Sequence, residues 1–214
     1  MPGPPVKRHV LNDTPIPVNQ GSHKVKVDGE FEDWDQIGTE YRDTRGDVFH
    51  RDHPGYGDLH YTDESGRNDI LTAKVSVGKK NLAFYAQTDQ ALSSHQDQNW
   101  MLLLIDADKN PETGWYGYDF LVNRQIKDQN STTLSAYDQE TGTWKETLTL
   151  PFAYQENHLE LSIPRRALGL QASDFEFDFK WSDNPAGLDD PISFCTGGDS
   201  APNRRFNYRY IWKK

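Results

Sequence analysis

An acidic loop between two apolar segments carries the residues best suited to hold a cation. Residues 106–114 read DADKNPETG and place oxygen-bearing side chains on alternate positions of a turn. Carboxylate, amide and hydroxyl oxygens are the hard ligands that Ca²⁺ prefers. The sequence therefore predicts a calcium site with ligands in this loop and just after it: Asp106, Asp108, Asn110, Thr113 and Asp119.

This loop does not follow the EF-hand pattern. Counted from Asp106, an EF-hand loop requires Gly at its sixth position and Glu at its twelfth, but the chain has Pro111 and Gly117 there. The alternative to a calcium site is a solvated turn in which Asp and Asn side chains cap nearby backbone N–H groups. Both interpretations place a chain reversal here.

Histidines and acids also gather in the glycine-rich segment 43–69, which shows neither strand nor helix periodicity. His50, Asp52, His53 and His60 could form a transition-metal or acid–base site. Their spacing matches no metal-ligand pattern, so a solvated loop with exposed histidines is the favoured interpretation. Long segments of this kind in compact domains are usually functional or disordered.

Aromatic residues near turns indicate a different chemistry. A saccharide ring offers C–H groups on its faces and hydroxyls at its rim, so its binding site needs an aromatic plate beside polar groups. Burial in the core is the alternative for each tryptophan, and it is favoured for Trp34, Trp100 and Trp212. The expected ligand-binding residues are Trp115, Tyr116, Trp144, Trp181, Asp183, Asn184, Arg204 and Arg205.

Short strands must position these residues. Apolar residues alternate with polar ones, or run continuously, in segments 71–77, 82–87, 101–105, 118–123, 132–137, 144–150, 159–163, 175–181 and 206–212. Segment 24–34 adds a short strand and a helical turn that ends near Ile37, and 165–170 starts after a proline and forms a second helical turn. We expect an all-β fold, an antiparallel β-sandwich of two packed sheets with at most one or two short helical turns.

Composition limits the number of domains and the partners. The 214 residues, 35% of them hydrophobic, suit one compact domain over 23–214, preceded by a Pro-rich linker or edge extension over 1–22. The net charge of -10 and the lack of a basic stripe argue against nucleic acid as a partner. No apolar run approaches the roughly 20 residues of a membrane span.

Catalytic motifs are missing from the sequence. It contains no Gly-x-Ser-x-Gly elbow, Cys-x-x-Cys pair, phosphate-binding glycine loop or His-Glu-x-x-His motif. The single cysteine, Cys195, cannot form an internal disulfide, and it is interpreted as buried filler. We therefore expect no enzymatic activity.

Several stretches together resemble a known family. They are KVDGEFEDW, NDILTAKVSV with NLAFYAQTD, IDADKNPETGWYGYDFLVN, and FDFKW with NYRYI. In this order they resemble the family 9 carbohydrate-binding modules and their relatives, from about residue 24 to residue 211. The resemblance implies a calcium-binding β-sandwich without catalysis of its own. It also implies an extracellular or cell-surface location, although nothing at the start of the chain resembles a signal peptide.

The implied partners are a polysaccharide or oligosaccharide and a catalytic domain in the same parent polypeptide. One family feature is missing, because members grip a terminal sugar between two tryptophans. The corresponding regions here, SSHQDQ (93–98) and GGDSAPNRRF (197–206), contain no tryptophan. We therefore do not expect this chain to bind a terminal sugar between two tryptophans.

Three functions remain open. The favoured one is a non-catalytic, calcium-stabilised carbohydrate-binding module that targets an attached glycoside-active enzyme to a polysaccharide. The second is a structural or docking domain of a larger glycosidase with no ligand of its own. The third is a glycoside hydrolase or lyase that uses segment 43–69, with His53 or Asp52 in the reaction.

Overall fold

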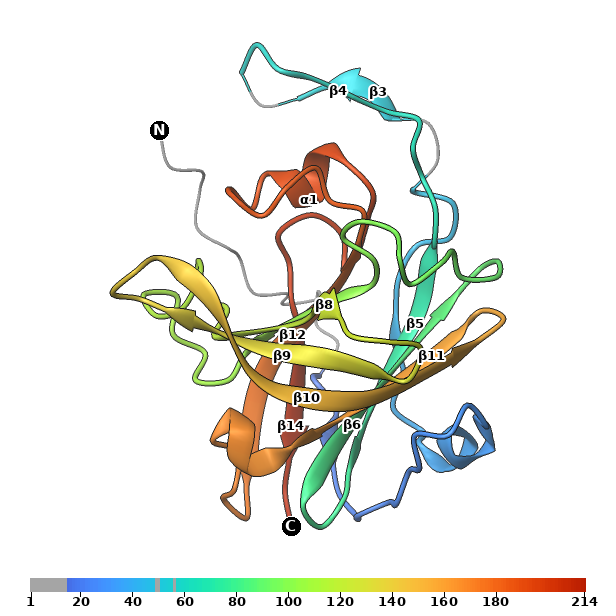
Figure 1. The fold of residues 1–214 in the computed structure, drawn as a ribbon, viewed down its shortest axis with the longest axis vertical. Helices are drawn as coiled ribbons and strands as arrows, with labels where there is room; N and C mark the ends of the chain where they lie inside the picture. The colour runs from blue at the N-terminus through green and yellow to red at the C-terminus, as the bar shows by residue number, and fades with distance from the viewer. Residues whose placement is uncertain (1–14, 49–50, 56) are drawn as a thin grey trace.

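The computed structural model describes residues 15–48, 51–55 and 57–214, and it consists mainly of β-strands (Figure 1). Helical segments are short: η1 Glu32–Gln36, η2 Arg165–Leu168 and α1 Ser193–Thr196. The strands are β1 Val18–Asn19, β2 Tyr41–Arg42, β3 Arg51–Pro54, β4 His60–Asp63, β5 Ile70–Val77, β6 Asn81–Thr88, β7 Leu102–Asp106, β8 Phe120–Ile126, β9 Ser131–Asp138, β10 Thr143–Gln155, β11 His158–Pro164, β12 Phe175–Asp183, β13 Asp199–Ala201 and β14 Tyr208–Trp212. The predicted all-β class is confirmed.

Strand β10 turns the large sheet into two layers. Its first part pairs with β9 as far as Pro151, and its last part, from Phe152 onward, pairs with β11. The sheet runs β1-β14-β12-β7-β8-β9-β10-β11-β6-β5-β2, with β13 paired to β12. All neighbours are antiparallel except β1 and β14, which are parallel. This is the predicted antiparallel sandwich, with the two layers continuous through one long strand.

Aromatic side chains fill the space between the layers. Phe177, Phe179 and Trp181 of β12 are all 0% exposed, as their alternation predicts. Phe84 of β6, in the opposite layer, lies 5.9 Å from the Phe177 ring and 6.0 Å from the Phe179 ring. Burial of each such ring stabilises the fold by roughly 2–3 kcal/mol. The core therefore depends on contacts between strands that are distant in sequence.

Strand β7 is buried on both faces, as its continuous apolar run predicts. Leu103 and Ile105 belong to the core between the layers. Leu102 and Leu104 point the other way, into a second cluster with Trp115 and other residues. We call this second cluster the outer aromatic cluster; its buried members are Leu102, Leu104, Trp115, Tyr118, Leu121 and Phe194. The strand that leads into the acidic loop is thus held from two sides.

Two segments differ from expectation. Residues 24–27 form no strand, because they lie over a sheet face, where Val25 packs with Trp34 and Tyr85, instead of pairing along an edge. Segment 43–69, expected to be a loop, contains the β3–β4 hairpin, which stands beyond α1 at one end of the molecule (Figure 1). Both predicted helical turns are confirmed as η1 and η2, and α1 is a third short helical segment that the sequence did not predict.

The N-terminal prediction is only partly covered by the structure. Residues 1–14 of the expected linker lie outside the described residues. Val18 and Asn19 pair with Ile211 and Trp212, so this part extends a sheet edge. Among the described residues, no helix has the length and apolarity needed to cross a membrane.

A buried glutamate attaches the covering segment 28–34 to the outer face of the second layer. Glu160 of β11 is 0% exposed. Its Oε1 accepts the backbone N–H groups of Asp28 and Gly29, both at 2.9 Å, and its Oε2 accepts the Trp34 indole N–H at 2.9 Å. Three donors therefore depend on one carboxylate.

Replacement of this carboxylate should destabilise the protein. In Glu160→Gln an NH₂ group faces one of the N–H donors, and hydrogen bonds to a charged acceptor are lost. We expect the free energy of unfolding to fall by about 2–3 kcal/mol, measured from urea unfolding. The control, Glu156→Gln, changes an exposed residue in the neighbouring turn and should have little effect. Equal stability of the two variants would contradict this role.

Candidate functional site

The β3–β4 hairpin is fixed to the α1 region by hydrogen bonds from its two strands. Arg51 and Asp63 are paired across the hairpin. The Arg51 guanidinium donates to the Gly198 carbonyl at 2.6 Å, and the Asp63 carboxylate accepts the Gly198 N–H at 2.7 Å. Gly198 has φ +60°, and a Cβ there would lie 1.9 Å from the Asp183 carbonyl oxygen. Only glycine fits at this anchoring position.

A cleft lies between the hairpin, the α1 region and the loop before β14. Its volume is about 530 Å³. The hairpin contributes Arg51, His53 and Tyr61, and the other two segments contribute Phe194 and several polar groups. The polar groups from the last loop are Asn203, Arg204 and Arg205, and Asp47 contributes a carboxylate. We refer to this feature as the hairpin cleft.

The ring of Tyr61 has a defined position in the cleft. A Cβ on Gly55 would lie 2.5 Å from the Tyr61 ring, so the ring packs directly on backbone where no side chain is present. The His53 ring meets it edge to face, with the centroids 5.7 Å apart. Because the ring is held on these sides and only half buried, it can offer a surface to a ligand.

The polar residues of the cleft differ in their exposure to solvent. The Asn203 side-chain amide donates to Asp43 Oδ1 at 3.0 Å and also to the Asp47 carboxylate. Arg204 is exposed, and Arg205 is half buried. Guanidinium groups beside an aromatic ring can bond hydroxyls or carboxylates in the plane of a ring stacked on Tyr61.

Two predicted ligand-binding residues are buried in structural roles. Trp181 is 0% exposed within the core, so its ring has no surface for a ligand. Asp183 is also 0% exposed, and it accepts the Met101 N–H at 2.9 Å and the Arg67 Nε–H at 2.9 Å. Burial raises the pKa of Asp183, while these two hydrogen bonds act in the opposite direction. Asn184 donates to Ser65 Oγ at 3.0 Å.

The other predicted aromatic residues come together on the outer face of the first layer. Trp115 lies 5.4 Å from Tyr116 and 6.4 Å from Trp144, between ring centroids. Trp115 itself is only 5% exposed, whereas Tyr116 and Trp144 are half buried. Phe194 stands perpendicular to Trp115 at 6.0 Å. Since Phe194 also lines the hairpin cleft, the outer aromatic cluster supports the cleft from behind.

The acidic loop brings three of its predicted metal ligands together. Carboxylate oxygens of Asp106, Asp108 and Asp119 lie within 4.8 Å of one another. Asp119 is placed by a backbone hydrogen bond to Ile105 at 2.9 Å, and its Oδ2 accepts the Ala107 N–H at 2.8 Å. Burial, and then the charge of Asp108, raise the pKa of Asp119. This donor set suits a hard divalent cation.

The remaining two predicted ligands form hydrogen bonds inside the loop. Thr113 Oγ1 donates to the Asp108 carboxylate at 3.0 Å, and Asn110 Oδ1 accepts the Glu112 N–H at 3.1 Å. Asp108 Oδ1 in turn accepts the Asn110 N–H at 2.8 Å. The loop is therefore a turn capped by its own side chains, and it also holds a cluster of three carboxylates with the oxygen ligands that calcium prefers.

Within the described part of segment 43–69, no histidine belongs to a group of three or more side chains close enough to hold one metal ion. His60 Nε2 lies 2.5 Å from Asp52 Oδ1, and both side chains are exposed. His53 belongs to the hairpin cleft, and His50 lies outside the described residues.

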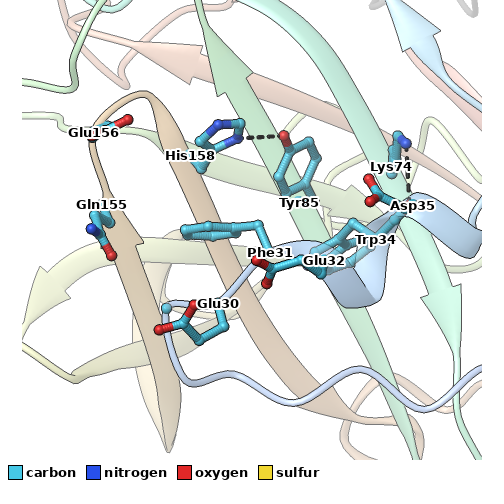
Figure 2. Close-up of a pocket in the computed structure, with 11 residues that line it drawn as sticks. Glu30, Phe31, Glu32, Trp34, Asp35, Lys74, Tyr85, Gln155, Glu156 and His158 are labelled. Carbon is cyan, nitrogen blue, oxygen red and sulfur yellow. Dashed lines mark hydrogen bonds between the residues drawn. The ribbon is translucent and has the colours of Figure 1, made fainter.

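A second hollow, of about 370 Å³, lies on the outer face of the other layer (Figure 2). The Phe31 ring stacks on His158 at 5.0 Å, and the Tyr85 hydroxyl lies 2.6 Å from His158 Nδ1. Glu30, Glu32, Asp35 and Glu156 surround these rings (Figure 2). The sequence does not predict this hollow. The stretch KVDGEFEDW, which carries part of the family resemblance, forms one of its walls.

Comparison of the chain with protein-family models, with curated proteins and with solved structures found no match.

His158 should make stability depend on pH. Burial lowers its pKa from the ordinary value of 6.5, so the unfolded chain binds a proton more readily than the folded chain. The free energy of unfolding should therefore fall as pH drops below about 6.5. Urea unfolding at pH 7.5 and 5.5 should show a smaller loss for His158→Gln than for the parent protein. The same loss in both proteins would exclude His158 as a contributor.

Proposed function

We propose that this chain is a non-catalytic carbohydrate-binding module and that the hairpin cleft is its saccharide site. One observation carries the proposal: the half-buried Tyr61 ring is held over Gly55 in the same cleft as Arg204 and Arg205. An aromatic surface with hydrogen-bonding groups at its margin is what a pyranose ring requires.

The position of the cleft supports the proposal further. Residues 203–205 belong to the last loop before β14, the region in which the resembled family carries one of its sugar-binding tryptophans. We propose that Tyr61, from the β3–β4 hairpin, supplies the stacking ring here. The difference predicts a different saccharide from the terminal sugar gripped by two tryptophans.

The arrangement of acids favours binding over cleavage. Among the described residues that line the cleft, Asp47 is the carboxylate, and it shares the Asn203 amide with Asp43. Their remaining oxygens, Asp43 Oδ2 and Asp47 Oδ1, are buried, so they cannot reach a glycosidic oxygen in the cleft. Asp52 and His60 are occupied with each other on the exposed hairpin.

The proposal includes calcium at the acidic loop and an attached catalytic domain in an extracellular or cell-surface protein. Calcium is supported by the three clustered carboxylates, and the other two elements rest on the family resemblance alone. A docking domain is the second candidate. Leu59 at the hairpin tip is 54% exposed and could contact another protein surface.

Saccharide binding can be tested on the purified chain with a glycan array, followed by calorimetry on the best oligosaccharide. Tyr61→Ala should weaken binding about tenfold or more, because the stacking surface is lost. Arg204→Ala should weaken it by a similar factor. A flat array would support the docking domain instead, and sugar release would support an enzyme.

Tyr116→Ala is the matched comparison, because it changes a half-buried tyrosine of the outer aromatic cluster and leaves the cleft intact. Binding should be retained in this variant. If Tyr116→Ala abolishes binding and Tyr61→Ala does not, the saccharide site lies on the outer aromatic cluster.

Calcium at the acidic loop should raise thermal stability by mass action. The melting temperature of chelator-treated protein should increase on addition of millimolar CaCl₂. Asp119→Asn should reduce this increase, because one of the three clustered carboxylates is lost. An unchanged increase in Asp119→Asn would show that the acidic loop is only a turn.

A further inference from the structure

A second group of carboxylates lies beside the hairpin cleft, far from the acidic loop in sequence. Asp43 follows β2, Asp47 lies in the next turn, and Asp199 begins β13. Carboxylate oxygens of these three residues lie within 4.8 Å of one another. Asp47 also lines the cleft, so the group and the cleft share a wall. Neither the fold nor the saccharide proposal explains this group.

Several oxygens of these carboxylates are buried without a partner. Asp43 Oδ2 and Asp47 Oδ1 accept no hydrogen bond from any residue that the structure describes. Asp199 is 0% exposed, and each of its oxygens accepts one N–H, from Ser200 at 2.7 Å and from Ile70 at 2.7 Å. Carboxylate oxygens buried away from water need a donor or a cation.

A fourth carboxylate faces the same turn. Asp69 is 3% exposed, and its Oδ2 accepts the Gly46 N–H at 2.7 Å, next to Asp47. Its Oδ1 is buried and has no hydrogen-bond partner in the described ranges. Because Gly46 directly precedes Asp47, the hydrogen bond from the Gly46 N–H places Asp69 beside the 43–47 turn. Three unpartnered oxygens thus come from segments 43–47 and 69.

A buried lysine lies close to this group of carboxylates. Lys180 is 0% exposed, and its ammonium group donates to the Pro202 carbonyl and lies 5.4 Å from the Phe194 ring centroid. Burial lowers the pKa of Lys180 to about 7, even though Asp43 and Asp199 act in the opposite direction. Within the described residues, Lys180 is a buried cation whose charge acts on both Asp43 and Asp199.

We propose that a hard divalent cation of the calcium class binds among Asp43, Asp47 and Asp199, with Asp69 at its edge. Bound there, the ion joins the 43–47 turn to β13 and to the start of β5, and through Asn203 it fixes the wall of the hairpin cleft. The unpartnered buried oxygens are the observation that separates this group from an ordinary acidic surface. The inference is independent of saccharide binding.

The test measures Ca²⁺ binding directly by calorimetry on the full chain after chelator treatment and desalting. The Asp119→Asn background removes a ligand of the acidic loop, so that binding at the second group can be observed. We expect this variant to bind one Ca²⁺ and to melt at a higher temperature when CaCl₂ is present. Addition of Asp47→Asn to this background should weaken that binding at least tenfold.

The matched control adds Asp58→Asn, at an exposed position of the hairpin turn, to the same background and should leave Ca²⁺ binding unchanged. Asp47→Asn is chosen because Asp47 is half buried, whereas Asp199 holds the Ile70 N–H in the core. No Ca²⁺ binding by Asp119→Asn, or equal binding with and without Asp47→Asn, would overturn the proposal. Because no sugar is present, a flat glycan array does not affect the outcome.

Discussion

Aspartates that accept backbone N–H groups, three of them buried and Asp63 half buried, hold the loops together at the hairpin end of the sandwich. Each bond joins segments that are far apart in sequence: Asp63 to Gly198 at 2.7 Å, Asp69 to Gly46 at 2.7 Å, Asp183 to Met101 at 2.9 Å, and Asp199 to Ile70 at 2.7 Å. Such bonds satisfy N–H groups that would otherwise be buried without a partner, and a charged acceptor strengthens them. The hairpin, the cleft and the second acidic group all depend on this set of contacts.

A buried carboxylate also needs a positive charge nearby. The buried carboxylates of this chain differ in the cationic side chains that they contact. Asp183 has Arg67 at 2.9 Å, and Asp178 has a bidentate pair with Arg209 at 2.7 and 3.0 Å. Within the described residues, Asp43 and Asp199 interact electrostatically with the buried Lys180 but form no ion pair with it. Since an uncompensated buried charge is costly, this difference supports the proposed cation site at Asp43, Asp47 and Asp199.

Saccharide binding requires an aromatic ring with an exposed face, and the surrounding side chains decide which rings have one. Trp115 and Trp181 are residues of the type that stacks on sugars, but Trp181 is enclosed by the core and Trp115 by the outer aromatic cluster. Tyr61, a smaller ring, is half buried and packs on the backbone of Gly55. Residue type alone does not separate these cases, because exposure is decided by neighbours from other strands.

The strands of the sandwich could be predicted from the sequence, because alternation with a period of two reports burial on one face and is a local property. The acidic loop could be predicted for the same reason, since Asp106, Asp108 and Asp119 are close along the chain. The β3–β4 hairpin could not, because most of its residues are exposed and carry no alternating apolar pattern. Asn203 and Asp47 are 156 positions apart, and only the closure of the two layers brings them together. The sequence by itself therefore determined the strands and the local turn, whereas the cleft and the second acidic group were decided by tertiary contacts.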